Sequence, residues 1–330
     1  MKSKLFKLAV AVFALLLSAG VLLAQKPEKA EAEEPPQEQP VRVMAADPGV
    51  VITMCLESGN IMVVGGDRRE VRVNADDEEA VVTLRRTENP KATTPAIRLE
   101  VLVSDSPKEA PLRMGECRGT SDIELEVPRG ATLYVKTREG DIEISDVAAA
   151  TAETTSGNVS VRRVAKSVEA MSVSGDVSLE DSNGRIRLRS ISGNVEATNA
   201  KIVEPNDTLY AKTMSGDVRL EQIAQQRVEA GTITGEVSLT GPLARGGSYD
   251  FKTTTGDITL NMPDNVSFQV TAIVSQGGEV ITDFPLKYMG GINTPDILSS
   301  GKIVGAYGTG QGAATLNLSS FSGTLRLRKM

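Results

Sequence analysis

The sequence contains no histidine, no tryptophan and only two cysteines. Without histidine, the chain lacks the usual general base, a common metal ligand and the side chain that changes charge near neutral pH. Serine or cysteine nucleophiles that depend on histidine are therefore excluded, as are zinc sites with histidine ligands or with four cysteines. Aromatic residues make up only 3% of the chain, so the core must consist of Val, Ile, Leu, Ala and Met.

The chain also lacks a basic tail and an excess of positive charge. Its 36 Lys and Arg against 43 Asp and Glu give a net charge of −7, which argues against nucleic acid as a partner. The 330 residues allow one long domain or two, and 40% of them are hydrophobic, which is enough for a core.

The first 24 residues have the pattern of a secretory signal. Lys2, Lys4 and Lys7 precede an uncharged apolar run over residues 8–23, and Ala24 follows. The run is shorter than the about 20 residues of a membrane span, but Leu22 stands where a cleavage site prefers a small residue. Residues 1–24 are thus a cleaved signal peptide or a retained N-terminal anchor. Either one predicts an exported chain, in the periplasm or at the cell surface.

Residues 25–48 are rich in Pro, Glu, Ala and Gln and nearly free of large apolar side chains. Such a segment cannot bury enough surface to fold, so we expect a disordered linker. The two cysteines, Cys55 and Cys117, follow it and do not form a CxxC motif. In an exported protein a pair of cysteines favours a disulfide, with two unbonded thiols as the alternative.

A repeat organises the rest of the chain. Its marker is Gly preceded by Ser, Thr or Glu and followed by Asp, Asn or Glu, and successive glycines are 17 to 23 residues apart. Apolar residues stand seven and five positions before each glycine and two and four positions after it. The repeat glycines are Gly140, Gly157, Gly175, Gly193, Gly216, Gly235 and Gly256.

Alternation of apolar and polar positions predicts two short strands in each repeat, each with one buried face, and glycine at the corner between them. A unit this small can bury its apolar face only by stacking on its neighbours. We therefore predict an all-β fold, a parallel β-solenoid with two strands per coil, right-handed by analogy with strand crossovers. Val177, Val195, Val218 and Val237 share one offset from the glycine and should form one buried column.

The same spacing recurs near both ends of the chain, at Gly59 and at Gly323, with irregular segments beside it. We assign residues 49–120 to an N-terminal β cap region, 121–284 to the solenoid repeats and 285–330 to a C-terminal cap with a closing repeat. Caps at both ends are expected because an open strand edge promotes aggregation.

Two polar columns accompany the repeat. Ser or Thr stands three positions before each glycine, where stacked hydroxyls can bond to each other and to the turn backbone. Asp, Asn or Glu directly follows the glycine, from Asp141 to Asp257. These oxygens could share Ca²⁺, but Asp and Asn are also ordinary turn residues. We predict no metal site and no cofactor.

One apolar column lies out of phase with the buried ones. Two positions before the glycine, four consecutive repeats carry Val173, Ile191, Met214 and Ile233. Either the chain turns early and buries these side chains, or they form an exposed apolar ladder. An exposed ladder would be a partner-binding stripe, because contiguous apolar surface usually has a purpose.

The stretch from Ile123 to Ile144, IELEVPRGATLYVKTREGDIEI, and the stretch over residues 308–328, with LNLSSFSGTLRLR, resemble the bacterial putative-adhesin β-strand-repeat family. The resemblance covers residues 50–330. It implies exported or envelope-facing bacterial proteins with a β-helix-like fold, and it supplies no catalytic residues.

The sequence therefore favours an exported, non-catalytic β-solenoid of the cell envelope, an adhesin-like interaction or structural module. Its partner would be an unidentified protein or polysaccharide, and contact with a membrane would arise only through an uncleaved N-terminal segment. One alternative is a membrane-anchored envelope-stress or regulatory component. Another is a polysaccharide-acting β-helix enzyme, which would need paired carboxylates in a cleft.

Overall fold

The computed structural model describes residues 41–89, 91–106, 116–288, 301–308 and 312–330. These ranges contain 26 strands and no helix, and they offer no helical segment that could cross a membrane. The predicted signal or anchor lies outside the described residues, as does most of the predicted linker. The linker does not reach residue 48, however, because a strand begins at Arg42, where Met44 and Ala46 pack on the core.

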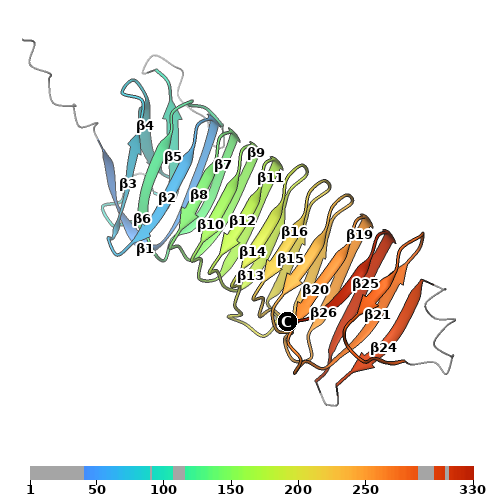
Figure 1. Ribbon diagram of the computed structural model, residues 1–330. Coiled ribbons are helices and arrows are strands. Elements are labelled where there is room, and N and C mark those ends of the chain that lie inside the picture. The colour runs from blue at the N-terminus through green and yellow to red at the C-terminus, as the bar shows by residue number, and fades with distance from the viewer. Residues whose placement is uncertain (1–40, 90, 107–115, 289–300, 309–311) are drawn as a thin grey trace, which may run out of the picture. The chain divides into compact units, whose positions relative to one another are not determined.

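The middle of the chain is a parallel β-solenoid with two facing sheets, as predicted (Figure 1). Each coil contributes one strand to each sheet, and a repeat glycine joins the two. The strands before the glycine form sheet B: β7 (Thr132–Glu139), β9 (Ala149–Ser156), β11 (Ser167–Ser174), β13 (Arg185–Arg189), β15 (Thr208–Lys212), β17 (Arg227–Gly231) and β19 (Ser248–Thr255). The strands after it form sheet A: β8 (Ile142–Ser145), β10 (Val159–Arg162), β12 (Val177–Glu180), β14 (Val195–Thr198), β16 (Val218–Glu221), β18 (Val237–Thr240) and β20 (Ile258–Met262).

Neighbouring coils pair in register, so equivalent residues stack. Val177 pairs with Val195, Val195 with Val218, and Val218 with Val237, and each of these side chains is 0% exposed. This confirms the predicted column. The inward residues are almost all aliphatic, and full burial of one such side chain contributes about 1.5–3 kcal/mol. Burial in both sheets therefore holds the coils together.

At the N-terminal end, the chain's first coil is not the outermost one. It consists of β1 (Arg42–Ser58) and β2 (Ile61–Gly66), and it lies between the coil of β7 and β8 and two cap strands, β5 (Ala96–Ser104) and β6 (Ile123–Pro128). Ile52, for example, pairs with Leu99 on one side and with Leu133 on the other. The antiparallel strands β3 (Glu70–Ala75) and β4 (Val81–Arg86) close the end.

The C-terminal end repeats this arrangement. The coil of β25 (Ala314–Ser322) and β26 (Leu325–Lys329) lies between β19 and β20 and the strands β21 (Phe268–Val274) and β22 (Val280–Thr282). In Figure 1 the dark red β25 accordingly lies between two orange strands. The antiparallel strands β23 (Lys287–Tyr288) and β24 (Lys302–Tyr307) pair beyond β21. Phe268, Phe284 and Tyr307 pack their rings together there, with centroids 4.8 to 5.7 Å apart.

The order of the coils in space thus differs from their order in the chain. The predicted cap region 49–120 includes a coil that belongs inside the stack, and the predicted closing repeat near residue 323 is not the last rung. The predicted boundary at residue 121 also divides structural neighbours, because β6 pairs with the cap strand β3. Alternation identifies which residues are equivalent, but it does not specify which coil lies next to which.

Candidate interaction surface

The repeat glycine forms the first corner of each coil, and the backbone there leaves no room for a side chain. In Gly216, φ is +137°, and a Cβ atom would lie 2.3 Å from the carbonyl oxygen of Gly193 in the preceding coil. Only glycine adopts this conformation readily. All seven repeat glycines have φ between +132° and +159°, so this corner has one geometry throughout the middle of the solenoid.

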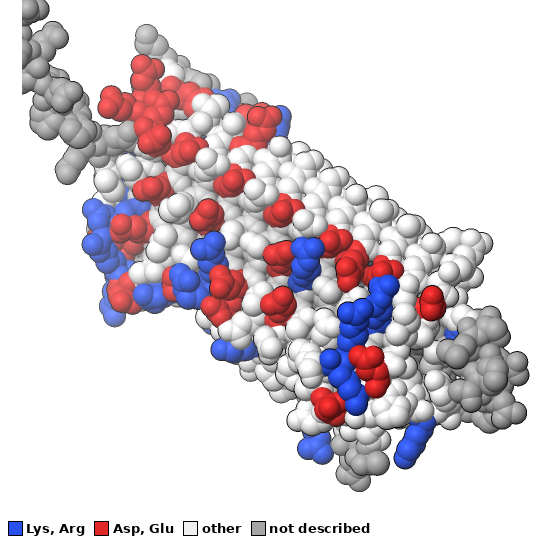
Figure 2. Space-filling model, in the orientation of Figure 1, with Lys and Arg blue, Asp and Glu red and all other residues white. Residues whose placement is uncertain are grey.

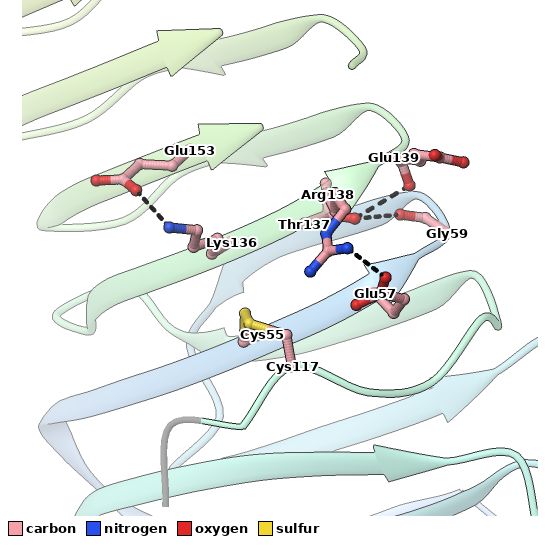
Figure 3. The surroundings of a disulfide bond; sticks show 9 residues. All are labelled: Cys55, Glu57, Gly59, Cys117, Lys136, Thr137, Arg138, Glu139 and Glu153. Carbon is pink, nitrogen blue, oxygen red and sulfur yellow. Dashed lines mark hydrogen bonds and ion pairs between the residues drawn. A yellow bond between two sulfur atoms is a disulfide. The ribbon is translucent and has the colours of Figure 1, made fainter. Parts of the chain in front are cut away.

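The Ser/Thr column bonds to the turn backbone, one of the two arrangements expected for it. The hydroxyl of Thr213 donates to the carbonyl of Gly193 at 2.8 Å, and that of Ser172 donates to Gly157 at 2.8 Å. Figure 3 shows the same contact at the N-terminal end, where Thr137 lies between the carbonyls of Gly59 and Glu139. These side chains are buried, so their role is to satisfy the buried carbonyls of the corner.

The Asp/Asn column also links one coil to the next. The amide of Asn158 donates to Oδ1 of Asp141 at 2.6 Å, the amide of Asp176 donates to Oδ1 of Asn158 at 2.9 Å, and Asn194 donates in turn to Asp176 at 2.7 Å. One side-chain oxygen at each of these rungs therefore already accepts a hydrogen bond. Within the described ranges, no three acidic or cysteine side chains gather as metal ligands. The absence of a calcium site remains a prediction.

The out-of-phase apolar column is exposed, so the early-turn alternative is wrong. Ile191, Met214 and Ile233 are 38%, 50% and 47% exposed, and Val173 is half-buried. The physical reason is the neighbouring hydroxyl column, which points inward to reach the glycine carbonyls and so turns the next residue outward. We call Val173, Ile191, Met214 and Ile233 the apolar ladder.

The ladder is held in register by hydrogen bonds of the backbone. The amide of Ser192 donates to the carbonyl of Val173 at 2.9 Å, and the amide of Ser215 donates to that of Ile191 at 2.9 Å. The carbonyl of Met214 accepts from the amide of Ile233 at 3.2 Å. Two coils further along, Phe321 occupies the equivalent position and is 48% exposed. The ladder is therefore a fixed row of side chains on a rigid edge.

Cations border the ladder on the outer face of sheet B. Tyr210 lies among three of them, with Lys212 Nζ at 4.5 Å, Arg189 Cζ at 5.0 Å and Arg187 Cζ at 5.1 Å from the ring centroid. Lys212 also forms an ion pair with Glu229. Burial by itself would lower the pKa of Lys212, but its hydrogen bonds to Glu229 and Tyr210 raise the pKa above its ordinary value. Lys212 is therefore charged at neutral pH.

Acidic side chains border the ladder on its other side, beyond the glycine. Asp176 and Glu236 are exposed there, and Asp217 is half-buried and forms an ion pair with Arg219 at 2.9 Å. On the face shown in Figure 2, acidic and basic residues are interspersed rather than separated into fields of one sign. Beside the ladder itself the two signs are separated: Arg189 and Lys212 form a positive border on sheet B, and Asp176, Asp217 and Glu236 form a negative border beyond the glycine.

A shallow hollow of about 340 Å³ lies on sheet A at the N-terminal end. Its lining includes Met62 and Val64, each 43% exposed, and Glu126. Arg68 forms an ion pair with Glu126 at 2.8 Å.

Cys55 on β1 and Cys117 form a disulfide, with Cα atoms 4.6 Å apart (Figure 3). The bond fastens the segment before β6 to the outer face of sheet B. The carbonyl of Gly119 adds to this attachment, because the amides of Glu57 and Ser58 both donate to it at 3.2 Å.

The fold and the repeat define a β-solenoid domain, and comparison with known proteins identifies its family. Residues 52–288 match the model of the Toastrack DUF4097 family, and the chain belongs to that family. The resemblance seen in residues 123–144 is thereby confirmed, whereas the stretch over residues 308–328 lies outside the matched range.

The search of curated proteins finds no match for this chain. Among solved structures, it is similar to a crystal structure of a putative cell adhesion protein from Clostridium sporogenes. The two are 9% identical, and the alignment covers 89% of this chain and all of the other, with a TM-score of 0.20. At that TM-score the similarity carries no conclusion about this chain.

Proposed function

We propose that this protein is an exported, non-catalytic β-solenoid of the bacterial cell envelope that serves as an interaction module. The observation that carries the proposal is the apolar ladder. Three of its four side chains are exposed and Val173 is half-buried, and all four lie in register on an edge whose backbone is fixed by inter-coil hydrogen bonds. Contiguous exposed apolar surface on a soluble fold is typical of a binding site, and a preformed one loses little entropy on association.

Export is supported by two features. The first is the charged, apolar and small-residue sequence of the first 24 residues. The second is the Cys55–Cys117 disulfide, since disulfides persist in oxidising compartments. If the apolar run over residues 8–23 is retained instead of cleaved, the protein is a membrane-anchored envelope component. N-terminal sequencing of the protein isolated from cells separates the two alternatives.

The test is a pull-down from envelope fractions with three forms of the protein. These are the wild type, the ladder variant Ile191→Ser/Met214→Ser, and the control variant Ile202→Ser/Val203→Ser. Ile202 and Val203 are 45% and 57% exposed in the loop over residues 201–207, so the control removes similar apolar surface at another place. We expect the wild type and the control to retain a component that the ladder variant loses. Equal capture by all three forms, with equal melting temperatures, would reject the ladder as the binding site.

A further inference from the structure

We propose that the apolar ladder binds a second copy of this chain, with the two solenoids side by side and parallel. The inference rests on the proposed function, because it names the partner of the same surface. It follows from the two borders of the ladder, which are positive on sheet B and negative beyond the repeat glycine.

The three rows can be followed coil by coil. In one coil, Lys212 precedes Met214 by two positions and Asp217 follows it by three. In the preceding coil, Arg189 stands two positions before Ile191. Among the residues that the structure describes, Arg189 contacts the Tyr210 ring but forms no ion pair. Within the described part of the chain, the positive border thus includes a guanidinium group that pairs with no carboxylate.

Two-fold symmetry allows the ladders to meet in two ways, and charge distinguishes them. Most homodimers use the same patch on both copies. When the two-fold axis runs parallel to the solenoid axis, each positive border faces the partner's negative border on both sides of the contact. When the two-fold axis lies in the contact plane and is perpendicular to the ladder, each border faces the partner's border of the same charge. Like charges opposite one another are unfavourable, so the parallel arrangement is favoured.

In the parallel arrangement each ladder residue faces the equivalent residue of the other copy. Met214 contacts Met214 of the other copy, and Ile191 contacts Ile191. Lys212 then lies on the same side of the contact as the other copy's Asp217, while Arg189 lies beside the other copy's Asp176 and Asp217, one coil away in either direction. Within each chain, Lys212 already forms an ion pair with Glu229, and Asp217 forms one with Arg219. These two ion pairs compete with the contacts between the copies.

The size of the strip determines the expected strength of association. From Val173 to Phe321 the edge spans six coils, or about 24 Å at about 4.8 Å per coil, and the edge is about 10 Å wide. Such a strip is smaller than the about 800 Å² per partner of a standard interface. We therefore expect a dimer that forms reversibly as concentration rises. A lipid surface of one charge fits less well, because it would meet both borders at once.

The first experiment is cross-linking through single introduced cysteines under mild oxidation, with the native disulfide intact. In the parallel dimer, Met214→Cys should cross-link with itself, as should Val173→Cys and Ile233→Cys separately. Ile202→Cys, on the loop, is the control and should give no cross-linked dimer. Preferential cross-linking of Val173→Cys with Ile233→Cys in a mixture would indicate the antiparallel arrangement and overturn the proposal, as would self-cross-linking of Met214→Cys no higher than that of the control.

The second experiment is a charge exchange. By sedimentation equilibrium, Lys212→Glu and Asp217→Lys should each weaken dimerisation about tenfold, and the double variant Lys212→Glu/Asp217→Lys should restore it, because both borders are then reversed together. Failure of the double variant to recover, at an unchanged melting temperature, would overturn the proposal. Vesicles with and without anionic lipid provide a further arm, and ladder-dependent binding to them by a monomer would overturn it too.

The outcomes separate this inference from the proposed function. If the wild type stays monomeric but the ladder variant still loses an envelope component, the self-association is wrong and the interaction module stands. If neither dimerisation nor capture depends on the ladder, both are wrong.

Discussion

The two corners of each coil make the same reversal of direction by different means. At the first corner, glycine, a buried hydroxyl and an Asp/Asn side chain all bond to the neighbouring coil. At the second corner, between the strand of sheet A and the next strand of sheet B, ordinary residues adopt left-handed conformations. Their φ values lie between +49° and +61°, and the residues are Asp146, Arg163, Asp181, Asn199 and Gln222.

This difference explains how coils of 17 to 23 residues stack in one register. The positions from seven before the glycine to four after it are constant, so all variation in length falls at the second corner. The longest coil carries an insertion there, over residues 201–207. The buried carboxylate of Asp207 holds it by accepting the amides of Val203 and Glu204 at 2.7 Å each. The first corner sets the register, and the second accommodates change.

The largest expected effect is a side chain at the first corner. Gly216→Ala places a Cβ atom 2.3 Å from the carbonyl oxygen of Gly193 at φ +137°, so strain and overpacking should lower the free energy of unfolding by about 3 kcal/mol or more. Gly246→Ala, in a loop at the second corner with φ +68° and no atom within 4 Å, is the matched control and should cost about 1 kcal/mol. Chemical denaturation measures both. Similar losses would mean that the corners do not differ in this way.

The next effect is the loss of a buried hydroxyl at the first corner. Thr213→Val keeps the shape but removes the donor to the carbonyl of Gly193, which should cost about 1–2 kcal/mol. Thr151→Val, on the outer side of β9 and half-buried, serves as the control and should change stability by less than half as much. A neutral Thr213→Val would show that water replaces the lost donor and that the hydroxyl column does not stabilise the corner.

A smaller effect concerns pH at the second corner. The hydrogen bond from Arg163, together with its charge, lowers the pKa of Asp146. A carboxyl group with a lowered folded-state pKa stabilises the fold above its ordinary pKa near 3.9, and this contribution is lost as pH falls through the folded-state value.

We therefore expect Asp146→Asn to reduce stability at pH 7 by about 0.5–1 kcal/mol and to make stability less dependent on pH below about 4. Thermal melts from pH 3 to pH 7 measure both effects. A remaining acid dependence is expected from Asp257. Burial by itself would raise the pKa of Asp257, but the hydrogen bonds from Arg326 and Thr324 outweigh burial and lower the pKa below its ordinary value. A variant with the full wild-type pH profile would contradict the assignment to Asp146.

The smallest effect is the reverse exchange, glycine introduced at the second corner. Gln222 has φ +54°, so Gln222→Gly relieves left-handed strain of about 1 kcal/mol. Glycine also raises the conformational entropy of the unfolded chain, which lowers stability by a similar free energy. The net change should lie within about 0.5 kcal/mol of zero. A loss comparable to that of Gly216→Ala would show that the second corner is as restricted as the first.

The sequence predicts the repeating part of the fold well, because each buried column has one offset from the glycine and the offset repeats. The exposure of the ladder was left open, since the alternation does not specify at which residue the chain turns. It follows once the inward direction of the hydroxyl column is known. Arg163 and Gln222 carry no signal for a left-handed conformation, unlike Asn or Asp. The inserted positions of the two terminal coils could not be predicted, because every coil presents equivalent edges to its neighbours.

The inserted first coil has a mechanical consequence. Tension transmitted through the chain before Arg42 would first act on residues 42–45, which among the described strands pair with β3 alone, at the edge of sheet A. Such tension would peel these residues away one bond at a time. It would next reach residues 51–58, which pair with β7 and in part with β5 in sheet B. There the force must shear hydrogen bonds on two sides together, beside the disulfide at Cys55. A domain pulled from the N-terminal side of Arg42 would therefore yield slightly and then resist.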